Sequence, residues 1–172
     1  MLSPRVIDLQ RAKRAISYLA GTANYHLIFH AEDEKEIYGW ADSSFNSGEG
    51  NRRNRYGYCF QLGKKSGVFV AVCKRSTLVA QSLTEAEFYC LAETCREMLW
   101  IRSFLQEILE EILCRKIFQD NTSIINMVSH EGVSERSKHI DVKFHILMKL
   151  KSSGEAEFPH INSLEMCADD IR

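Results

Sequence analysis

The sequence predicts an α/β domain, in which a mixed five-stranded sheet is flanked by helices and preceded by an amphipathic helix. Three strand-like runs follow one another with no helical pattern between them, which favours antiparallel neighbours. Two further strand-like runs come later, each after a helical pattern, which favours crossover connections. Together these two observations predict one sheet that contains both kinds of strand pair.

The first helix is expected over residues 6–20. Its apolar side chains recur at helical spacing: Leu9, Ala12, Ile16 and Leu19. Basic side chains lie between them, so that one face is apolar and the rest is charged. A short polar stretch over residues 31–36 separates this helix from the first strand.

The three successive strands are expected over residues 37–41, 56–62 and 68–73. The first strand is apolar and ends at Asp42, whereas the second alternates apolar and polar side chains. Residues 63–67 have the composition of a hairpin turn between the second and third strands. Residues 43–54 are rich in Ser, Asn and Gly and are expected to be irregular.

A long helical pattern runs from Thr84 to about residue 111, which is enough for two helices with a bend between them. Thr84 followed by Glu87 fits a capping box, in which two side chains bond backbone N–H groups at the helix start. The remaining elements are a strand over residues 114–118 that ends at Asp120, helices over residues 122–128 and 139–151, and a strand over residues 156–161.

The composition is that of a folded protein. Of the 172 residues, 45% are hydrophobic and 26% are charged, which argues against disorder. No apolar run approaches the roughly 18 residues of a membrane-spanning helix. The N-terminus has no apolar segment typical of a signal peptide. We therefore expect an intracellular protein without membrane contact.

The net charge of −1 gives no support for nucleic-acid binding, so any such function depends on where the charges lie. Basic residues are concentrated in one stretch: Arg52, Arg53, Arg55, Lys64, Lys65, Lys74 and Arg75. The six cysteines form no Cys-x-x-Cys pair, so buried reduced thiols are expected and a structural zinc site is disfavoured. Trp40 and Trp100 are expected in the core.

Acidic residues recur where a strand ends or a helix begins: Asp42, Glu87, Asp120 and Asp169. Neighbouring strands lie about 4.8 Å apart, so carboxylates at one end of a sheet can converge. Such a cluster repels itself unless cations neutralise it, and oxygen ligands suit hard ions such as Mg²⁺ or Mn²⁺. Two ions about 4 Å apart can hold the attacking water and the leaving oxygen of a phosphodiester in line. Ordinary surface acids are the alternative, since the chain has 23 Asp and Glu.

Five short motifs occur in order along the chain. They are ADSSFNSG from Ala41, RRNRYGY from Arg52, SLTEAEF from Ser82, DNTS from Asp120 and SKHID from Ser137. In wording and spacing they resemble the ribonuclease H domain of copia-type retrotransposon Pol polyproteins. The stretch AKR from Ala12, followed by YLAGT from Tyr18, is similar to the sequence that precedes this domain in those polyproteins. The resemblance covers nearly the whole chain.

The resemblance implies a ribonuclease H-like fold over residues 35–172, and identifies residues 1–34 with the tail of the preceding reverse transcriptase or connection segment. It implies an endoribonuclease that cuts the RNA strand of RNA–DNA hybrids with two ions, Mg²⁺ or Mn²⁺, during reverse transcription. The implied partners are the hybrid and the upstream reverse transcriptase domain. The implied location is a cytoplasmic virus-like particle or the nucleus.

The family's catalytic and metal-binding carboxylates carry over to Asp42, Glu87, Asp120 and Asp169. Of the two glutamates in the third motif, Glu87 matches the family position, and Glu85 lies about 200° away around a helix. We therefore expect Glu85 to face elsewhere. Family position and charge imply nucleic-acid contacts from Arg52, Arg53, Lys74, Arg75, Ser76, Asn121, Lys138 and His139.

The chain departs from the family pattern at two places. Ser44 replaces an aspartate of the first motif, and the sequence ends three residues after Asp169, where the family continues into a helix. Asp169 is therefore expected to be loosely held, as in a fragment or a degraded copy of the element. His139, Asp141 and His145 suit substrate contact or helix capping better than zinc. His160 is either an ordinary strand-end residue or an aid to product release.

Three functional hypotheses remain open at this point. The first is an endoribonuclease acting on RNA–DNA hybrids, which the intact carboxylates favour. The second is an inactive or weakly active remnant that keeps the fold and binds nucleic acid, which the departure near Asp169 favours. The third is a protein-interaction module that uses the same fold. A cleavage assay on a labelled hybrid separates the first from the others.

Overall fold

The computed structural model describes residues 3–44, 54–77, 79–80, 82–109, 115–129, 138–169 and 171, with only the backbone described over residues 138–142. Its elements are α1 (Val6–Gly21), β1 (Ile37–Ser44), β2 (Arg55–Leu62), β3 (Val68–Arg75), α2 (Leu83–Gln106), β4 (Arg115–Phe118), α3 (Thr122–Ser129), α4 (Lys138–Ser152) and the 3-10 helix η1 (Ser163–Glu165). The predicted order of strands and helices is therefore confirmed for the described residues, except for the last strand. The predicted loop over residues 43–54 lies largely outside the described residues, and its first two residues belong to β1.

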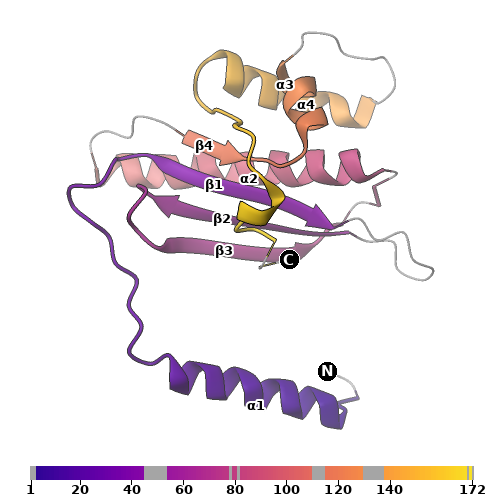
Figure 1. Cartoon of the computed structure of the whole chain (residues 1–172). Helices are drawn as coiled ribbons and strands as arrows, with labels where there is room; N and C mark the ends of the chain where they lie inside the picture. Colours follow the sequence, from indigo (N-terminus) through magenta and orange to yellow (C-terminus); the bar gives the residue numbers. More distant parts are fainter. Residues whose placement is uncertain are drawn as a thin grey trace.

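The sheet is mixed, as predicted. Its strand order is β3-β2-β1-β4, and β1 pairs antiparallel with β2 but parallel with β4. Figure 1 shows α2 along one face of the sheet, with α3 and α4 near its β4 end. The C-terminal segment, drawn in yellow, lies on the opposite face of the sheet from α2.

Both faces of the central strand β1 are covered, which explains why residues 37–41 are all apolar. Ile37 and Ala41 belong to the main core, to which α2, α3 and α4 also contribute side chains. Tyr38 and Trp40 alternate with them and pack in a second cluster on the other face. The second cluster is completed by Cys59, Met166 and Ala168.

The fifth predicted strand is present only as two isolated bridges beside β4. The bridges join Lys116 with Glu157 and Gln119 with His160, both parallel. Pro159 lies between them and has no N–H to donate to the carbonyl of Ile117, although its own carbonyl accepts from the N–H of Gln119 at 3.1 Å. The prediction of a strand over residues 156–161 is thus right in place and direction, and proline interrupts its hydrogen bonding.

The predicted capping box at the start of α2 is wrong. The helix begins at Leu83, and the N-cap is Ser82, whose hydroxyl accepts a hydrogen bond from the N–H of Glu85 at 3.1 Å. Glu87 lies within the helix and is buried. The predicted bend is also absent from the described residues, in which α2 runs as one helix to Gln106.

Helix α1 lies apart from the sheet in Figure 1 and has no buried residue. Its apolar side chains Leu9, Ile16 and Leu19 are all more than half exposed. The segment that follows it is fixed to the hairpin between β2 and β3, where the Asp33 carboxylate accepts hydrogen bonds from the N–H groups of Lys64 and Lys65 at 3.2 and 2.7 Å. The helix is therefore joined to the domain through an anchored linker.

Two expectations about core residues are partly wrong. Cys59, Cys90 and Cys95 are buried free thiols, but Cys73 and Cys167 are exposed. Trp40 is in the core, whereas Trp100 is 62% exposed and stacks on Phe104 along the outer side of α2. In the part of the chain that the structure describes, no helix combines the length and apolar character needed to cross a bilayer.

Candidate metal centre

Two aspartates meet because β1 and β4 are parallel neighbours. The register places Trp40 beside Phe118. Asp42 lies two residues after Trp40, and Asp120 lies two residues after Phe118. Parallel strands bring equivalent ends to the same edge of a sheet. The two carboxylates therefore reach one end of the sheet from adjacent strands.

A third carboxylate comes from α2, which packs across β1. Glu87 lies in the second turn of this helix, and its side chain turns toward the end of the sheet. One oxygen each of Asp42, Glu87 and Asp120 lies within 4.8 Å of the others. Asp42 and Glu87 are 3% and 4% exposed, so two of the three acids are almost fully removed from water.

Each oxygen of the Glu87 carboxylate has a hydrogen-bond donor. The backbone N–H of Ser43 donates to Oε1 at 3.3 Å, and the side-chain amide of Gln119 donates to Oε2 at 3.0 Å. Burial raises the pKa of Glu87 to about 7, and the nearby charge of Asp42 adds to this, while the two hydrogen bonds oppose it. The site therefore holds Glu87 in place but disfavours its negative charge.

Asp120 is fixed from the C-terminal segment and is followed by a helix start. The hydroxyl of Ser163 donates to Oδ2 of Asp120 at 2.8 Å. Directly after it, the side-chain oxygen of Asn121 accepts from the N–H of Ser123 at 3.0 Å, which is a cap for α3. Asp120 is only half-buried, so it forms the more open side of the group.

The three side chains fit a hard divalent cation. All offer carboxylate oxygens, which are the ligands that such ions prefer. Burial disfavours the charge of Glu87 in the metal-free site, and repulsion from Asp42 adds to this, so that both raise its pKa. A bound cation would lower the pKa of Glu87 again, because opposite charge favours the ionised carboxylate.

Comparison with solved structures identifies the fold. A ribonuclease H1 known as LC11-RNase H1, crystallised in complex with an RNA/DNA hybrid, superposes on 78% of this chain and 92% of its own with a TM-score of 0.56, at 15% identity. The fold is that of ribonuclease H. The predicted fold class is thereby confirmed, with four regular strands in the described residues in place of five.

Comparison with curated sequences finds relatives among retrotransposon polyproteins. The chain is 29% identical over 160 residues to the retrovirus-related Pol polyprotein from transposon TNT 1-94 of Nicotiana tabacum, which is 93% of this chain. It is 27% identical over 172 residues to that from transposon RE1 of Arabidopsis thaliana, which is 99% of this chain. The chain spans 12% of the length of each. No protein-family model matches it. The resemblance to Pol polyproteins seen in the motifs is confirmed.

Within this ribonuclease H fold, three of the four predicted carboxylates come together and the fourth stays outside the group. Glu87 belongs to the group and Glu85 does not, as expected from their positions on the helix. Asp169 is exposed and is not a member. Its neighbour Ala168 is fully buried in the cluster on the face of β1 that bears Tyr38 and Trp40, so the segment packs against the sheet although Asp169 is exposed.

Of the residues predicted to contact nucleic acid, the structure describes the side chains of four: Lys74, Arg75, Ser76 and Asn121. Lys74 and Arg75 are exposed at the end of β3, and Ser76 directly after them is buried. Asn121 is half-buried beside Asp120. The structure does not describe Arg52 and Arg53, nor the side chains of Lys138, His139 and Asp141. His160 is exposed beside β4, and both interpretations of it stay open.

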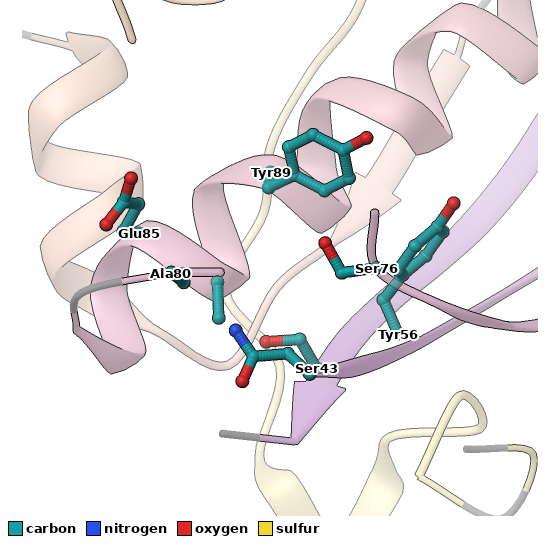
Figure 2. A pocket seen from close by; sticks show the side chains of 8 residues that line it. Ser43, Tyr56, Ser76, Ala80, Glu85 and Tyr89 are labelled. Carbon is teal, nitrogen blue, oxygen red and sulfur yellow. The ribbon is translucent and has the colours of Figure 1, made fainter. Parts of the chain in front are cut away.

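A small pocket adjoins the carboxylate group. Figure 2 shows Ser43, Tyr56, Ser76 and Tyr89 around it, with Glu85 at the start of α2. Ser43 is the neighbour of Asp42, so the pocket begins one residue from the candidate metal ligands. Ser76, just after β3, also lines it, whereas Asp42, Glu87 and Asp120 are not among its lining residues.

Sequence reasoning missed Gln119 and Ser163, whose side chains hold Glu87 and Asp120. A signal for Gln119 was present, since it continues the alternation of inward-facing residues along β4 and is polar at a position where an apolar residue is expected. Ser163 had no comparable signal, because its contact with Asp120 depends on how the C-terminal segment folds back.

Proposed function

We propose that this chain is an endoribonuclease that hydrolyses the RNA strand of RNA–DNA hybrids and forms part of a retrotransposon Pol polyprotein. The observation that carries the proposal is the group of Asp42, Glu87 and Asp120 at one end of a ribonuclease H fold. The Pol polyprotein relatives support the polyprotein context. The structural neighbour crystallised with an RNA/DNA hybrid supports the substrate class.

The proposal assigns two divalent ions, Mg²⁺ or Mn²⁺, to this group, with Asp169 as a weaker contributor from its exposed position. When bound, such ions lower the pKa of water and stabilise charge that develops on a phosphodiester. The chain supplies the rigid frame: Asp42 and Asp120 are set by the register of β1 and β4. Glu87 is held by hydrogen bonds from Ser43 in β1 and from Gln119, the residue after β4.

A metal titration of hybrid cleavage tests this function. The chain should cut the RNA strand only when Mg²⁺ or Mn²⁺ is present, and a chelator should stop the reaction. Cleavage that persists in the chelator would assign the activity to chemistry other than that of these carboxylates.

The exposed cations at the end of β3 are proposed to contact phosphates. Lys74→Ala combined with Arg75→Ala should weaken binding to every hybrid sequence alike, because phosphate contacts carry no base information. The slope of log affinity against log salt should fall by roughly 0.7–0.9 for each phosphate that the protein no longer neutralises. Fluorescence anisotropy with a catalytically silent variant at several salt concentrations measures both effects.

A matched control removes two cations elsewhere. Lys13→Ala with Arg14→Ala changes the same net charge on α1, far from β3 along the chain, and should leave the salt slope nearly unchanged. An equal fall in slope for both pairs, or a loss of affinity confined to certain sequences, would contradict the assignment. The same experiment extends to Arg52 and Arg53, which the sequence places in this set.

Helix α1 is proposed to be the tail of the upstream reverse transcriptase segment and to pack on that domain, within a virus-like particle or the nucleus. Its apolar face is exposed and none of its residues is buried. An isolated helix of 16 residues is only marginally stable in water, so we expect α1 to be stabilised by packing its apolar face on another domain. The curated relatives are far longer and continue beyond the matched segment, which supports such a neighbour.

Deletion of residues 1–24 should therefore leave the domain's thermal unfolding midpoint within about 2 °C of the full chain. The deletion keeps Asp33 and its hydrogen bonds to the hairpin. Differential scanning calorimetry measures the midpoint. A fall of about 5 °C or more would show that α1 packs on this domain.

A hybrid-binding remnant with little catalysis is the second candidate. The position of Asp169 favours it, because this carboxylate is exposed and lies outside the group of three. In that case hybrid binding should persist while cleavage stays near background at every metal concentration.

A further inference from the structure

Gln119 is a buried residue directly after β4, and its side chain forms a hydrogen bond with Glu87. It is fully buried and follows Arg115 and Ile117 on the inward-facing side of β4. Asp120 comes directly after it. Its backbone is fixed on the other side, where its N–H donates to Pro159 and its carbonyl accepts from Ile161, both at 3.1 Å.

The side chain of Gln119 donates a hydrogen bond to the carboxylate of Glu87 at 3.0 Å. The other oxygen of that carboxylate accepts from the backbone of Ser43, next to Asp42. Glu87 is thus held by one donor from β1 and one from the residue directly after β4, next to the two aspartates. With both oxygens bonded, rotation of the carboxylate breaks at least one of these bonds.

Packing does not explain a glutamine at this position. Its Oε1 atom is buried, and no donor to it occurs among the described residues. A buried acceptor without a partner is unfavourable, whereas an apolar residue of similar length would carry no such penalty. The amide therefore brings a penalty at Oε1, and the feature that accounts for a glutamine here is its hydrogen bond to Glu87.

We propose that Gln119 is a positioning residue, which fixes the Glu87 carboxylate toward Asp42 and Asp120 so that the three can bind a divalent cation together. The inference rests on the proposed function, and it adds a residue outside the predicted set of ligands. Groups that orient a ligand in this way typically contribute a factor of about 10 to 100 in metal affinity. Gln119 acts on metal binding through Glu87 and does not contact the ion itself.

The test compares Mn²⁺ binding to Gln119→Met and to the unmodified full chain by electron paramagnetic resonance of free Mn²⁺. Methionine keeps the length and removes both polar atoms. The affinity should fall by roughly 10- to 100-fold. The metal-free unfolding midpoint should change little, since the substitution removes both the unpaired Oε1 and the hydrogen bond to Glu87, and these two losses have opposite effects on stability. Cleavage by the variant should recover toward the original rate as Mn²⁺ is raised.

Ile117→Val is the matched control, because Ile117 is equally buried on the same side of β4 and its hydrocarbon side chain cannot form a hydrogen bond to Glu87. It should lower the midpoint and leave Mn²⁺ affinity unchanged. Unchanged affinity in Gln119→Met, or an equal loss of affinity in Ile117→Val, would overturn the role of Gln119. Asp42→Asn distinguishes failure of the role of Gln119 from failure of the proposed function. If Asp42→Asn also leaves the Mn²⁺ affinity unchanged, the three carboxylates do not form the metal site.

Discussion

Asp42→Asn is expected to reduce hybrid cleavage by roughly 1,000-fold or more while the fold is retained. The substitution keeps the shape of the side chain and removes the negative charge that faces Glu87 and Asp120. Bound divalent ions contribute several kcal/mol to phosphodiester hydrolysis, and each 1.36 kcal/mol is about a factor of ten in rate. Without metal, the variant should be as stable as the original chain or more so, since carboxylate repulsion is relieved.

Cleavage rates of a labelled hybrid, measured beside circular dichroism spectra, check this outcome. Asp120→Asn should have a comparable effect, because Asp120 belongs to the same group. Asp169→Asn should have a smaller effect, because its carboxylate is exposed and outside the group. Near-original cleavage by Asp42→Asn would show that the assignment of Asp42 is wrong. An equal loss of cleavage in all three variants would show that Asp169 works with the others.

The metal-free protein is expected to lose stability as the pH rises from about 4.5 to about 7, because of Glu87. Burial, with the charge of Asp42, raises the pKa of this group from 4.5 to about 7. The folded state therefore binds a proton that the unfolded state has released. The stabilisation that comes from this proton is fully present below pH 4.5, the pKa of Glu87 in the unfolded chain. It is lost as the pH rises through about 7, the pKa of Glu87 in the folded protein. The pKa difference corresponds to roughly 3 kcal/mol of unfolding free energy.

Glu87→Gln should remove most of this pH dependence, since the amide has the same shape and does not ionise. Urea unfolding at pH 5 and pH 8 in the presence of a chelator measures the difference. Glu85→Gln is the matched control, since Glu85 is on the same helix but outside the carboxylate group, and it should keep the dependence. If Glu87→Gln loses as much stability between the two pH values as the original chain, Glu87 is not the group responsible.

Local patterns in the sequence predicted most of the fold. The alternation of residues 56–62 and the hairpin turn after them predicted two antiparallel strands, which are present as β2 and β3. The helical spacing after residue 84 predicted α2, although the cap is Ser82. Serine and threonine two residues apart are both good N-caps, so the sequence alone does not choose between them.

The features that the sequence did not predict depend on contacts between distant segments. The hydrogen bond of Gln119 to Glu87 joins residues 32 positions apart, and that of Ser163 to Asp120 joins residues 43 apart. Trp100 was expected in the core because tryptophan is often buried, yet it lies on the outer side of α2. Nothing in its local sequence distinguishes that side from the inner one. The positions of Asp42, Glu87 and Asp120, by contrast, followed from strand ends and a motif, and they meet in space.

We propose that the carboxylates at the end of β1 and β4 make this chain a nuclease for the RNA strand of a hybrid. The most direct measurement is the product analysis of one hybrid with either strand labelled, incubated with Mg²⁺ or Mn²⁺ beside the same RNA alone. We predict cleavage of the RNA strand only when it is paired with DNA, with 5′-phosphate and 3′-hydroxyl ends and an intact DNA strand. Binding of the hybrid without any cleavage, or equal cleavage of the unpaired RNA, would contradict it.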